Sequence, residues 1–171
     1  LDRVLMIGVS QSGGSPDLVH SLEVARQQRA LTLAITNQAG SPLAQAAELE
    51  LDVLAGSEQA VAATKSYTAQ LLALYLIFDR LRGGSPDSAA ALPDLADRLI
   101  AGDDGVRTLA QRYRFASRLV TTARGYSYPT AREAALKLME TSYLGAQAFS
   151  GADLLHGPLA MIDPQVPVLA I

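Results

Sequence analysis

Short apolar runs alternate with longer amphipathic stretches along this chain. Short apolar runs bounded by turn residues are typical of buried parallel strands, whereas apolar positions three or four residues apart indicate helices. This pattern predicts an α/β fold in which a parallel sheet is flanked by helices and ligands bind at the carboxyl ends of the strands. Strands are expected at 3–9, 31–36, 49–54, 117–123 and 168–171, and helices at 15–29, from 41, at 60–81, twice within 92–114, and from about 125–130 to 145.

Two stretches of this pattern bear on the organisation of the chain. The 60–81 helix carries apolar residues all round its middle, which predicts packing on several sides. The run Gly83-Gly84-Ser85-Pro86-Asp87-Ser88 then breaks the pattern and is the best linker candidate. We therefore expect three parts, at residues 1–84, 85–116 and 117–171, of which the middle part is a helical linker region.

The polar turn after the first expected strand has the chemistry of a phosphate site. Ser10, Gln11, Ser12 and Ser15 supply hydroxyl and amide donors, and Gly13 lets the backbone approach a ligand closely. Backbone N–H groups and the positive end of the following helix converge at such a turn. An ordinary polar turn with a serine cap is equally compatible with these residues. Because the loop has no lysine or arginine, a phosphate monoester suits it better than a triphosphate.

Glu133, Lys137 and Glu140 recur at i, i+4 and i+7 and therefore share one face of the helix expected near residues 130–145. A carboxylate with a tuned pKa is suited to moving a proton between two carbon atoms of a sugar. The same spacing is also typical of a solvated, ion-paired helix face. Of the two histidines, His156 by itself is as compatible with a cap or core role as with catalysis, and His20 is expected to be structural or exposed.

Composition narrows the function classes. The formal net charge of -3 and the pI near 5.3 provide no basic field, so nucleic acid is not expected as a partner. The longest apolar run, residues 71–78, is short of the roughly 20 residues that a membrane span needs. The chain has no cysteine, which suits a cytoplasmic protein and excludes thiolate metal sites. No cofactor or metal is expected.

Four segments together resemble the sugar isomerase (SIS) family, and in particular its aminosugar branch. The first is the phosphate-loop sequence Ser10-Gln11-Ser12-Gly13, and the second runs from Gly56 to Ser66. The third and fourth are Ala134-Ala135-Leu136-Lys137-Leu138-Met139-Glu140 and Leu155-His156-Gly157-Pro158-Leu159-Ala160. The resemblance covers nearly the whole chain and is weakest between Ser85 and Arg114. Gln147 and Asp153 depart from it, because the family's synthases have glutamates there.

The resemblance implies a role for each matching residue. Glu140 would be the proton-transfer base, with Glu133 and Lys137 beside it. His156 would assist opening of the sugar ring and reach the site of a neighbouring subunit, which implies a homodimer with shared active sites. The expected phosphate ligands are Ser10, Gln11, Ser12 and Ser15, and the expected sugar contacts are Val61 and Ala63. Family synthases have serine at the position of Ala63, so no hydroxyl contact is expected from it.

The resemblance also implies an organisation and an activity. Such proteins carry two SIS modules in tandem, so we expect residues 1–84 to be the later part of one module and 117–171 the first part of the next, with strands 4–9 and 168–171 equivalent. The chain alone would then be inactive. The expected reaction is aldose–ketose isomerisation with deamination of glucosamine 6-phosphate to fructose 6-phosphate, because Ser15-Pro16-Asp17-Leu18 is similar to the deaminases. The alternatives are the isomerase portion of a glutamine-dependent synthase and a sugar-phosphate-sensing module.

Overall fold

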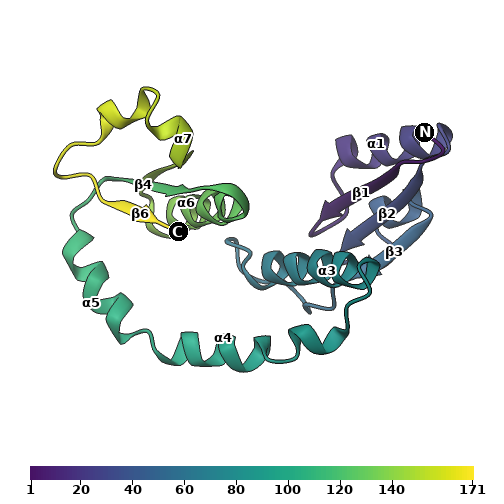
Figure 1. Ribbon diagram of the computed structural model, residues 1–171, viewed down its shortest axis with the longest axis horizontal. Coiled ribbons are helices and arrows are strands. Elements are labelled where there is room, and N and C mark those ends of the chain that lie inside the picture. Colours follow the sequence, from purple (N-terminus) through teal and green to yellow (C-terminus); the bar gives the residue numbers. More distant parts are fainter. The chain divides into compact units, whose positions relative to one another are not determined.

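The computed structural model describes residues 1–171, which divide into two compact units at residues 1–92 and 93–171. Each unit contains one three-stranded parallel sheet with helices packed against it (Figure 1). The α/β class with parallel sheets flanked by helices is therefore confirmed. The proposed three-part division at residues 84 and 116 stays a prediction.

The first unit has the strand order β1-β2-β3. Its elements are β1 (Leu5–Ser10), α1 (Pro16–Gln27), β2 (Leu31–Thr36), α2 (Pro42–Ala46), β3 (Leu49–Asp52), α3 (Lys65–Leu81) and the 3-10 helix η1 (Pro86–Ala89). The central strand β2 is buried on both faces, because Leu22 and Leu43 from α1 and α2 pack on Ala34, whereas Ala73 of α3 packs with Leu33 and Ile35. Each fully buried leucine stabilises the fold by about 1.5–3 kcal/mol.

The second unit has the strand order β5-β4-β6. Its elements are α4 (Leu92–Ala101), α5 (Asp104–Tyr113), β4 (Arg118–Ala123), η2 (Gly125–Ser127), α6 (Tyr128–Ser142), β5 (Gly145–Ser150), α7 (Gly151–Leu154), η3 (Pro158–Met161) and β6 (Val168–Ala170). The buried Thr121 hydroxyl donates to the Ala131 carbonyl at 2.7 Å, which ties β4 to α6. Val120, Leu154 and Val166 form a small core cluster in this unit.

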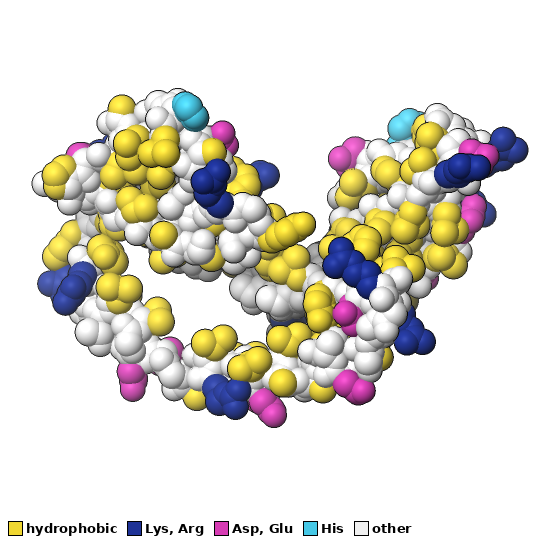
Figure 2. All heavy atoms as spheres, in the orientation of Figure 1, with side chains coloured by type: hydrophobic (Ala, Val, Ile, Leu, Met, Phe, Trp, Pro, Cys, Tyr) yellow, Lys and Arg dark blue, Asp and Glu magenta, His cyan; other side chains and the backbone are white.

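The helices α4 and α5 confirm the expected amphipathic pair between Leu92 and Arg114. Neither contains a buried residue. Hydrophobic side chains are visible along both helices in the space-filling view (Figure 2). At the end of α4, Leu99 is 78% exposed and Ile100 is 74% exposed, so these apolar side chains face solvent.

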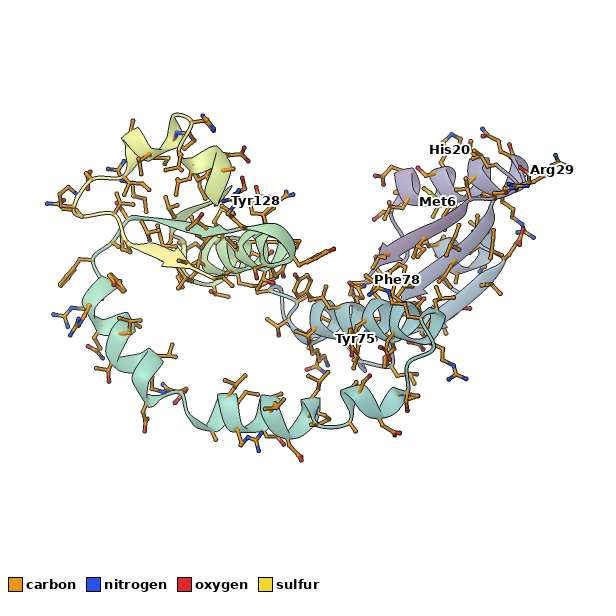
Figure 3. The ribbon with its side chains drawn as sticks, in the orientation of Figure 1. Met6, His20, Arg29, Tyr75, Phe78 and Tyr128 are labelled. Carbon is orange, nitrogen blue, oxygen red and sulfur yellow. The ribbon has the colours of Figure 1, made fainter.

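Three expectations about elements differ from the structure. The helix expected from residue 60 begins at Lys65, because side chains hold the preceding residues in an extended loop, as described below. Its predicted packing on several sides is wrong for this chain: Ala73 is buried, whereas Tyr75 and Phe78 are each 48% exposed (Figure 3). Strand β5 was not expected, because its sequence Gly-Ala-Gln-Ala-Phe-Ser has few β-branched residues.

No helix combines the length and the apolar character that crossing a membrane requires.

The backbone at Gly13 is where the first loop packs against its unit. Its φ is +63°, and a Cβ added there would overlap the Oγ atom of Ser41, which is only 4% exposed. The Gly13 carbonyl also accepts from the Leu43 N–H at 2.9 Å, at the start of α2. Both the conformation and the close approach therefore require glycine at this position.

Replacing Gly13 with alanine is expected to lower the free energy of unfolding by about 2–4 kcal/mol, because a left-handed backbone and an overlap with Ser41 must both be relieved. Gly40→Ala is the matched control. Gly40 has a φ of +67° but nothing within 4 Å of the added Cβ. The free energy of unfolding of the Gly40→Ala variant should fall by only about 1–2 kcal/mol, the cost of a left-handed backbone at a residue with a Cβ atom. Urea denaturation of both variants measures the difference, and equal losses would contradict the packing argument.

Candidate functional site

Serine hydroxyls organise the loop between β1 and α1. The Ser10 hydroxyl accepts from the Gly13 N–H at 3.1 Å, and the Ser12 hydroxyl accepts from the Gly14 N–H at 3.3 Å. Two of the backbone donors expected to face a ligand are therefore already bonded within the loop. The serines accept in these bonds, so their O–H hydrogens remain free to turn toward an incoming anion.

The start of α1 leaves further donors at this loop. Ser15 occupies the N-cap position, but its side chain makes no capping hydrogen bond. The first N–H groups of an α-helix have no partner within the helix, and the helix dipole favours negative charge there. Gln11 and Ser12 are exposed and Ser15 is partly exposed. The structure thus places all the predicted phosphate-binding residues on one short loop at the carboxyl end of β1.

Asn37, which the sequence reasoning did not select, links this loop to the segment that follows β3. It lies directly after β2, and its backbone N–H donates to the Gln11 carbonyl at 3.0 Å. Its side-chain amide donates to the Gly56 carbonyl at 2.8 Å and accepts from the Ala55 N–H at 2.9 Å. Its position in the sequence could have identified it as a site residue. A polar residue directly after a buried parallel strand lies at the edge of the sheet where ligands bind.

The predicted sugar contacts Val61 and Ala63 lie in the segment from Ala55 to Thr64, which we call the 55–64 loop. Val61 is 98% exposed, whereas Ala63 is partly buried. Lys65, at the start of α3, turns back and donates from Nζ to the Ser57 carbonyl at 2.5 Å. This loop and the phosphate loop belong to the same unit, and Asn37 connects them.

The Glu58 carboxylate joins the first half of the 55–64 loop to the start of α3. One carboxylate oxygen, Oε2, accepts from the Ser66 hydroxyl at 2.8 Å and from the Ser66 N–H at 3.3 Å. These hydrogen bonds, the side-chain one above all, hold the pKa of Glu58 below its ordinary value of 4.5. Ser66 is only 1% exposed, so the bond joins the loop to a buried position of the helix.

Glu133, Lys137 and Glu140 form one ion-paired cluster on α6. The Lys137 Nζ atom lies 2.7 Å from Glu140 Oε2 and 3.3 Å from Glu133 Oε1. The three side chains are 21–29% exposed, which distinguishes them from a fully solvated helix face. The hydrogen bond to Glu140, with a smaller contribution from Glu133, raises the pKa of Lys137. Lys137 is therefore a cation that holds two carboxylates near each other.

His156 lies elsewhere in the second unit, between α7 and η3. Its backbone N–H donates to the Asp153 carbonyl at 3.0 Å, and its side chain is exposed. Hydrogen bonds and ion pairs join Glu133, Lys137 and Glu140, and none of them includes His156. His20 is exposed on α1, in agreement with the expectation for it (Figure 3).

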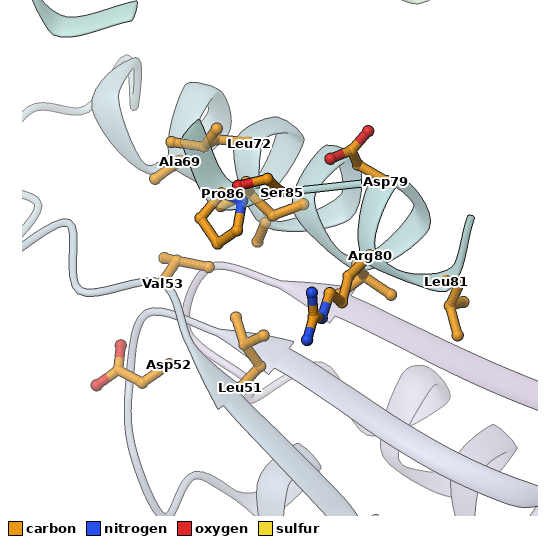
Figure 4. Close-up of a pocket in the computed structure, with 13 residues that line it drawn as sticks. Leu51, Asp52, Val53, Ala69, Leu72, Asp79, Arg80, Leu81, Ser85 and Pro86 are labelled. Atoms are coloured by element: carbon orange, nitrogen blue, oxygen red, sulfur yellow. The ribbon is translucent and has the colours of Figure 1, made fainter. Parts of the chain in front are cut away.

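The first unit also has a cavity of about 670 Å³ that contains none of the predicted site residues. It lies between the end of β3, the helix α3 and the start of η1, and its walls include Leu51, Val53, Leu72 and Pro86 (Figure 4). The lining is mostly apolar. Such a lining offers a phosphate group few hydrogen-bond donors.

The SIS domain profile matches residues 2–80 and 113–171. The chain therefore belongs to the SIS domain family. Over its entire length it is 40% identical to the glutamine–fructose-6-phosphate aminotransferase (isomerizing) of Mycolicibacterium smegmatis. The corresponding enzyme of Methanothermobacter thermautotrophicus is also 40% identical, over 99% of the chain. In each case the chain spans only 29% of the relative's length.

Solved structures agree with this assignment. The C-terminal domain of the glucosamine–fructose-6-phosphate aminotransferase from Francisella tularensis superposes with a TM-score of 0.82 at 29% identity, over 99% of this chain and 51% of that one. The glucosamine-6-phosphate deaminase of Thermotoga maritima gives a TM-score of 0.79 at 24% identity, over 99% of this chain and 53% of that one. The second comparison supports the fold alone.

The two ion pairs on α6 predict how the pKa of Lys137 changes when each glutamate is replaced. Because the pKa of Lys137 is raised, its ion pairs stabilise the folded state below the ordinary lysine value of 10.5, and that stability is lost as the pH rises through the folded pKa. Glu140→Gln should lower the pKa of Lys137 toward 10.5, and Glu133→Gln should lower it less.

The chain has only two lysines, so NMR of the lysine side chains in the alkaline range resolves Lys137, with Lys65 as an internal control. Arg132→Gln, on the same helix but outside the cluster, should leave the titration unchanged. If the two glutamate variants shift Lys137 equally, or not at all, the order of the two interactions is wrong.

Proposed function

We propose that this chain is part of an aminosugar-phosphate isomerase, namely the isomerase portion of a glutamine–fructose-6-phosphate aminotransferase. One observation carries the proposal: along its full length the chain is 40% identical to such enzymes. The partly buried Glu133–Lys137–Glu140 cluster supports it, because a module that only senses sugar phosphates has no need of a carboxylate base. The activity of this chain by itself is not part of the proposal.

In this proposal the substrate phosphate binds at the loop formed by Ser10, Gln11, Ser12 and Ser15. The hydroxyl groups and the first turn of α1 supply the donors. Val61 and Ala63 of the 55–64 loop contact the sugar. The hydrogen bonds of Asn37 support the assignment of phosphate to one loop and sugar to the other, because they join the two loops within one unit.

Glu140 acts as the base in the proposed reaction. Ammonia adds to C2 of open-chain fructose 6-phosphate and water leaves, which gives an imine. Glu140 then removes a proton from C1 while the imine nitrogen gains one, which gives a C1–C2 enaminol. Protonation of C2 with loss of the O1 hydroxyl proton yields the aldehyde form of glucosamine 6-phosphate. Lys137 keeps the carboxylate in place through the 2.7 Å contact, and Glu133 balances the lysine charge. His156 assisting ring opening from a neighbouring subunit, the homodimer that this implies and the cytoplasmic location all remain predictions.

The deaminase reaction is the second candidate, and one observation favours it. The sequence Ser15-Pro16-Asp17-Leu18 at the start of α1 is similar to that of deaminases. The comparisons favour the aminotransferase, since relatives of that name reach 40% identity whereas the deaminase structure shares 24%. Both candidates use the same proton transfer at Glu140, so the isomerase chemistry does not separate them.

Following the nitrogen atom separates the two candidates. The whole protein that carries this chain is incubated with fructose 6-phosphate and glutamine, and glutamate and glucosamine 6-phosphate are measured. We expect both products in equal amounts. A parallel incubation with glucosamine 6-phosphate alone measures ammonia and fructose 6-phosphate. Ammonia release without glutamate formation in the first assay would establish the deaminase instead.

Glu140→Gln is expected to slow exchange of the substrate's C2 proton with solvent by at least about 100-fold, because the amide keeps the shape of the side chain but cannot act as a base. Phosphate binding should be unchanged. Glu23→Gln, an exposed position on α1, is the control for a charge change outside the site. Deuterium incorporation at C2, followed by NMR in the whole protein, measures the rate. Wild-type exchange in the Glu140→Gln variant would remove Glu140 as the base.

A further inference from the structure

We propose that Asn37 and Glu58 are positioning residues that clamp the 55–64 loop, Asn37 at its first residues and Glu58 by joining it to the start of α3, and thereby set the sugar contacts of Val61 and Ala63. This inference rests on the proposed function, because that function gives the loop its ligand. The clamp consists of hydrogen bonds within the first unit. The clamping of the loop and its proposed role in sugar binding can therefore be tested separately.

The 55–64 loop needs such a clamp because little else holds it. It has no helix or strand of its own, and none of its side chains is buried. Loops with few buried apolar contacts open at low free-energy cost. A binding contact is useful only if the group is held within a fraction of an ångström of its productive position. Hydrogen bonds from the surrounding framework must therefore supply the order that packing does not.

Asn37 is the clamp at the beginning of the loop. Its side-chain amide donates to the Gly56 carbonyl and accepts from the Ala55 N–H. These two bonds to backbone groups resemble those that a neighbouring strand would make just beyond the end of β3. Its own backbone N–H is bonded to the Gln11 carbonyl in the phosphate loop. One residue therefore fixes the distance between the proposed phosphate subsite and the start of the sugar-contact loop.

Glu58, the fourth residue of the loop, forms the second clamp, which joins the loop to the start of α3. Its carboxylate accepts two hydrogen bonds from Ser66, whose side chain is buried in the first turn of α3. Glu58 and Ser66 bracket Val61 and Ala63 in the sequence, so the bond closes a short ring of residues that contains both. The hydrogen bond from Lys65 Nζ to the Ser57 carbonyl supports the same closure. The Lys65 ammonium group is therefore bonded to the backbone of the loop.

The test compares Asn37→Ala and Glu58→Ala with Gln59→Ala, an exposed loop residue that makes no hydrogen bond in the structure. Amide hydrogen exchange of residues 55–66 is followed first, without ligand, in the full chain. We expect exchange to be about tenfold faster in both clamp variants, as the loss of about 1.4 kcal/mol of hydrogen bonding predicts, and unchanged in the control. Thermal denaturation checks that each variant is folded. Ser66→Ala, which removes the other partner of the Glu58 bond, provides a second route to the same loop opening.

Ligand binding is then measured by calorimetry with two probes. Inorganic phosphate reports on the Ser10–Ser15 loop alone, and fructose 6-phosphate reports on both loops. The clamp variants should bind fructose 6-phosphate about tenfold more weakly while the dissociation constant for phosphate changes less than about twofold. Ser12→Ala should weaken binding of both probes.

Unchanged amide exchange in the clamp variants would overturn the inference. So would a loss of fructose 6-phosphate affinity that is matched by an equal loss for phosphate, or by an equal loss in Gln59→Ala. If the unaltered protein binds phosphate but gains no affinity from the sugar, the proposed role of the 55–64 loop in the function fails instead, and faster exchange in the variants would still identify Asn37 and Glu58 as its structural clamps.

Discussion

The parallel pairing of strands within each unit is the constraint on which the rest of the structure depends. Because β1, β2 and β3 run in the same direction, their carboxyl ends lie along one edge of the sheet. The phosphate loop, Asn37 and the 55–64 loop follow these three ends in turn. Asn37 therefore reaches both Gln11 and the residues Ala55 and Gly56, and these hydrogen bonds form without any contribution from the other unit.

Helices pack on both faces of β2, the central strand of this sheet. Ala34 lies under α1 and α2, whereas Leu33 and Ile35 lie under α3, so the strand is fixed from two sides. The close approach of Gly13 to Ser41 then ties the phosphate loop to α2. The proposed ligand groups thus extend from a framework whose packing leaves little freedom, while their own hydroxyl groups remain free to rotate. A loop built in this way can meet an anion without a large change of the backbone.

The phosphate loop of the first unit and the α6 cluster of the second unit differ in their charged side chains. The phosphate loop has no cationic side chain, so it depends on hydroxyl groups and the first turn of α1. The α6 cluster instead holds two carboxylates around Lys137, and their hydrogen bonds raise its pKa. In that arrangement Lys137 contacts Glu140 on one side and Glu133 on the other. Each arrangement lies within one unit, so its contacts do not depend on the other unit.

The sequence by itself determined the α/β class, the position of most elements and the residues that share a loop or a helix face. These are local properties: β2 is an apolar run between turn residues, and Glu133, Lys137 and Glu140 share a face through helical spacing alone. Only the tertiary structure decided where α3 begins, that β5 is a strand, and that Asn37 and Glu58 hold the 55–64 loop. The helix start was missed because the bond between Glu58 and Ser66 overrides helix-compatible residues, and β5 was missed because pairing with β4 stabilises a strand of low intrinsic propensity. Such contacts depend on residues brought together by the sheet, and no local pattern in the chain records them.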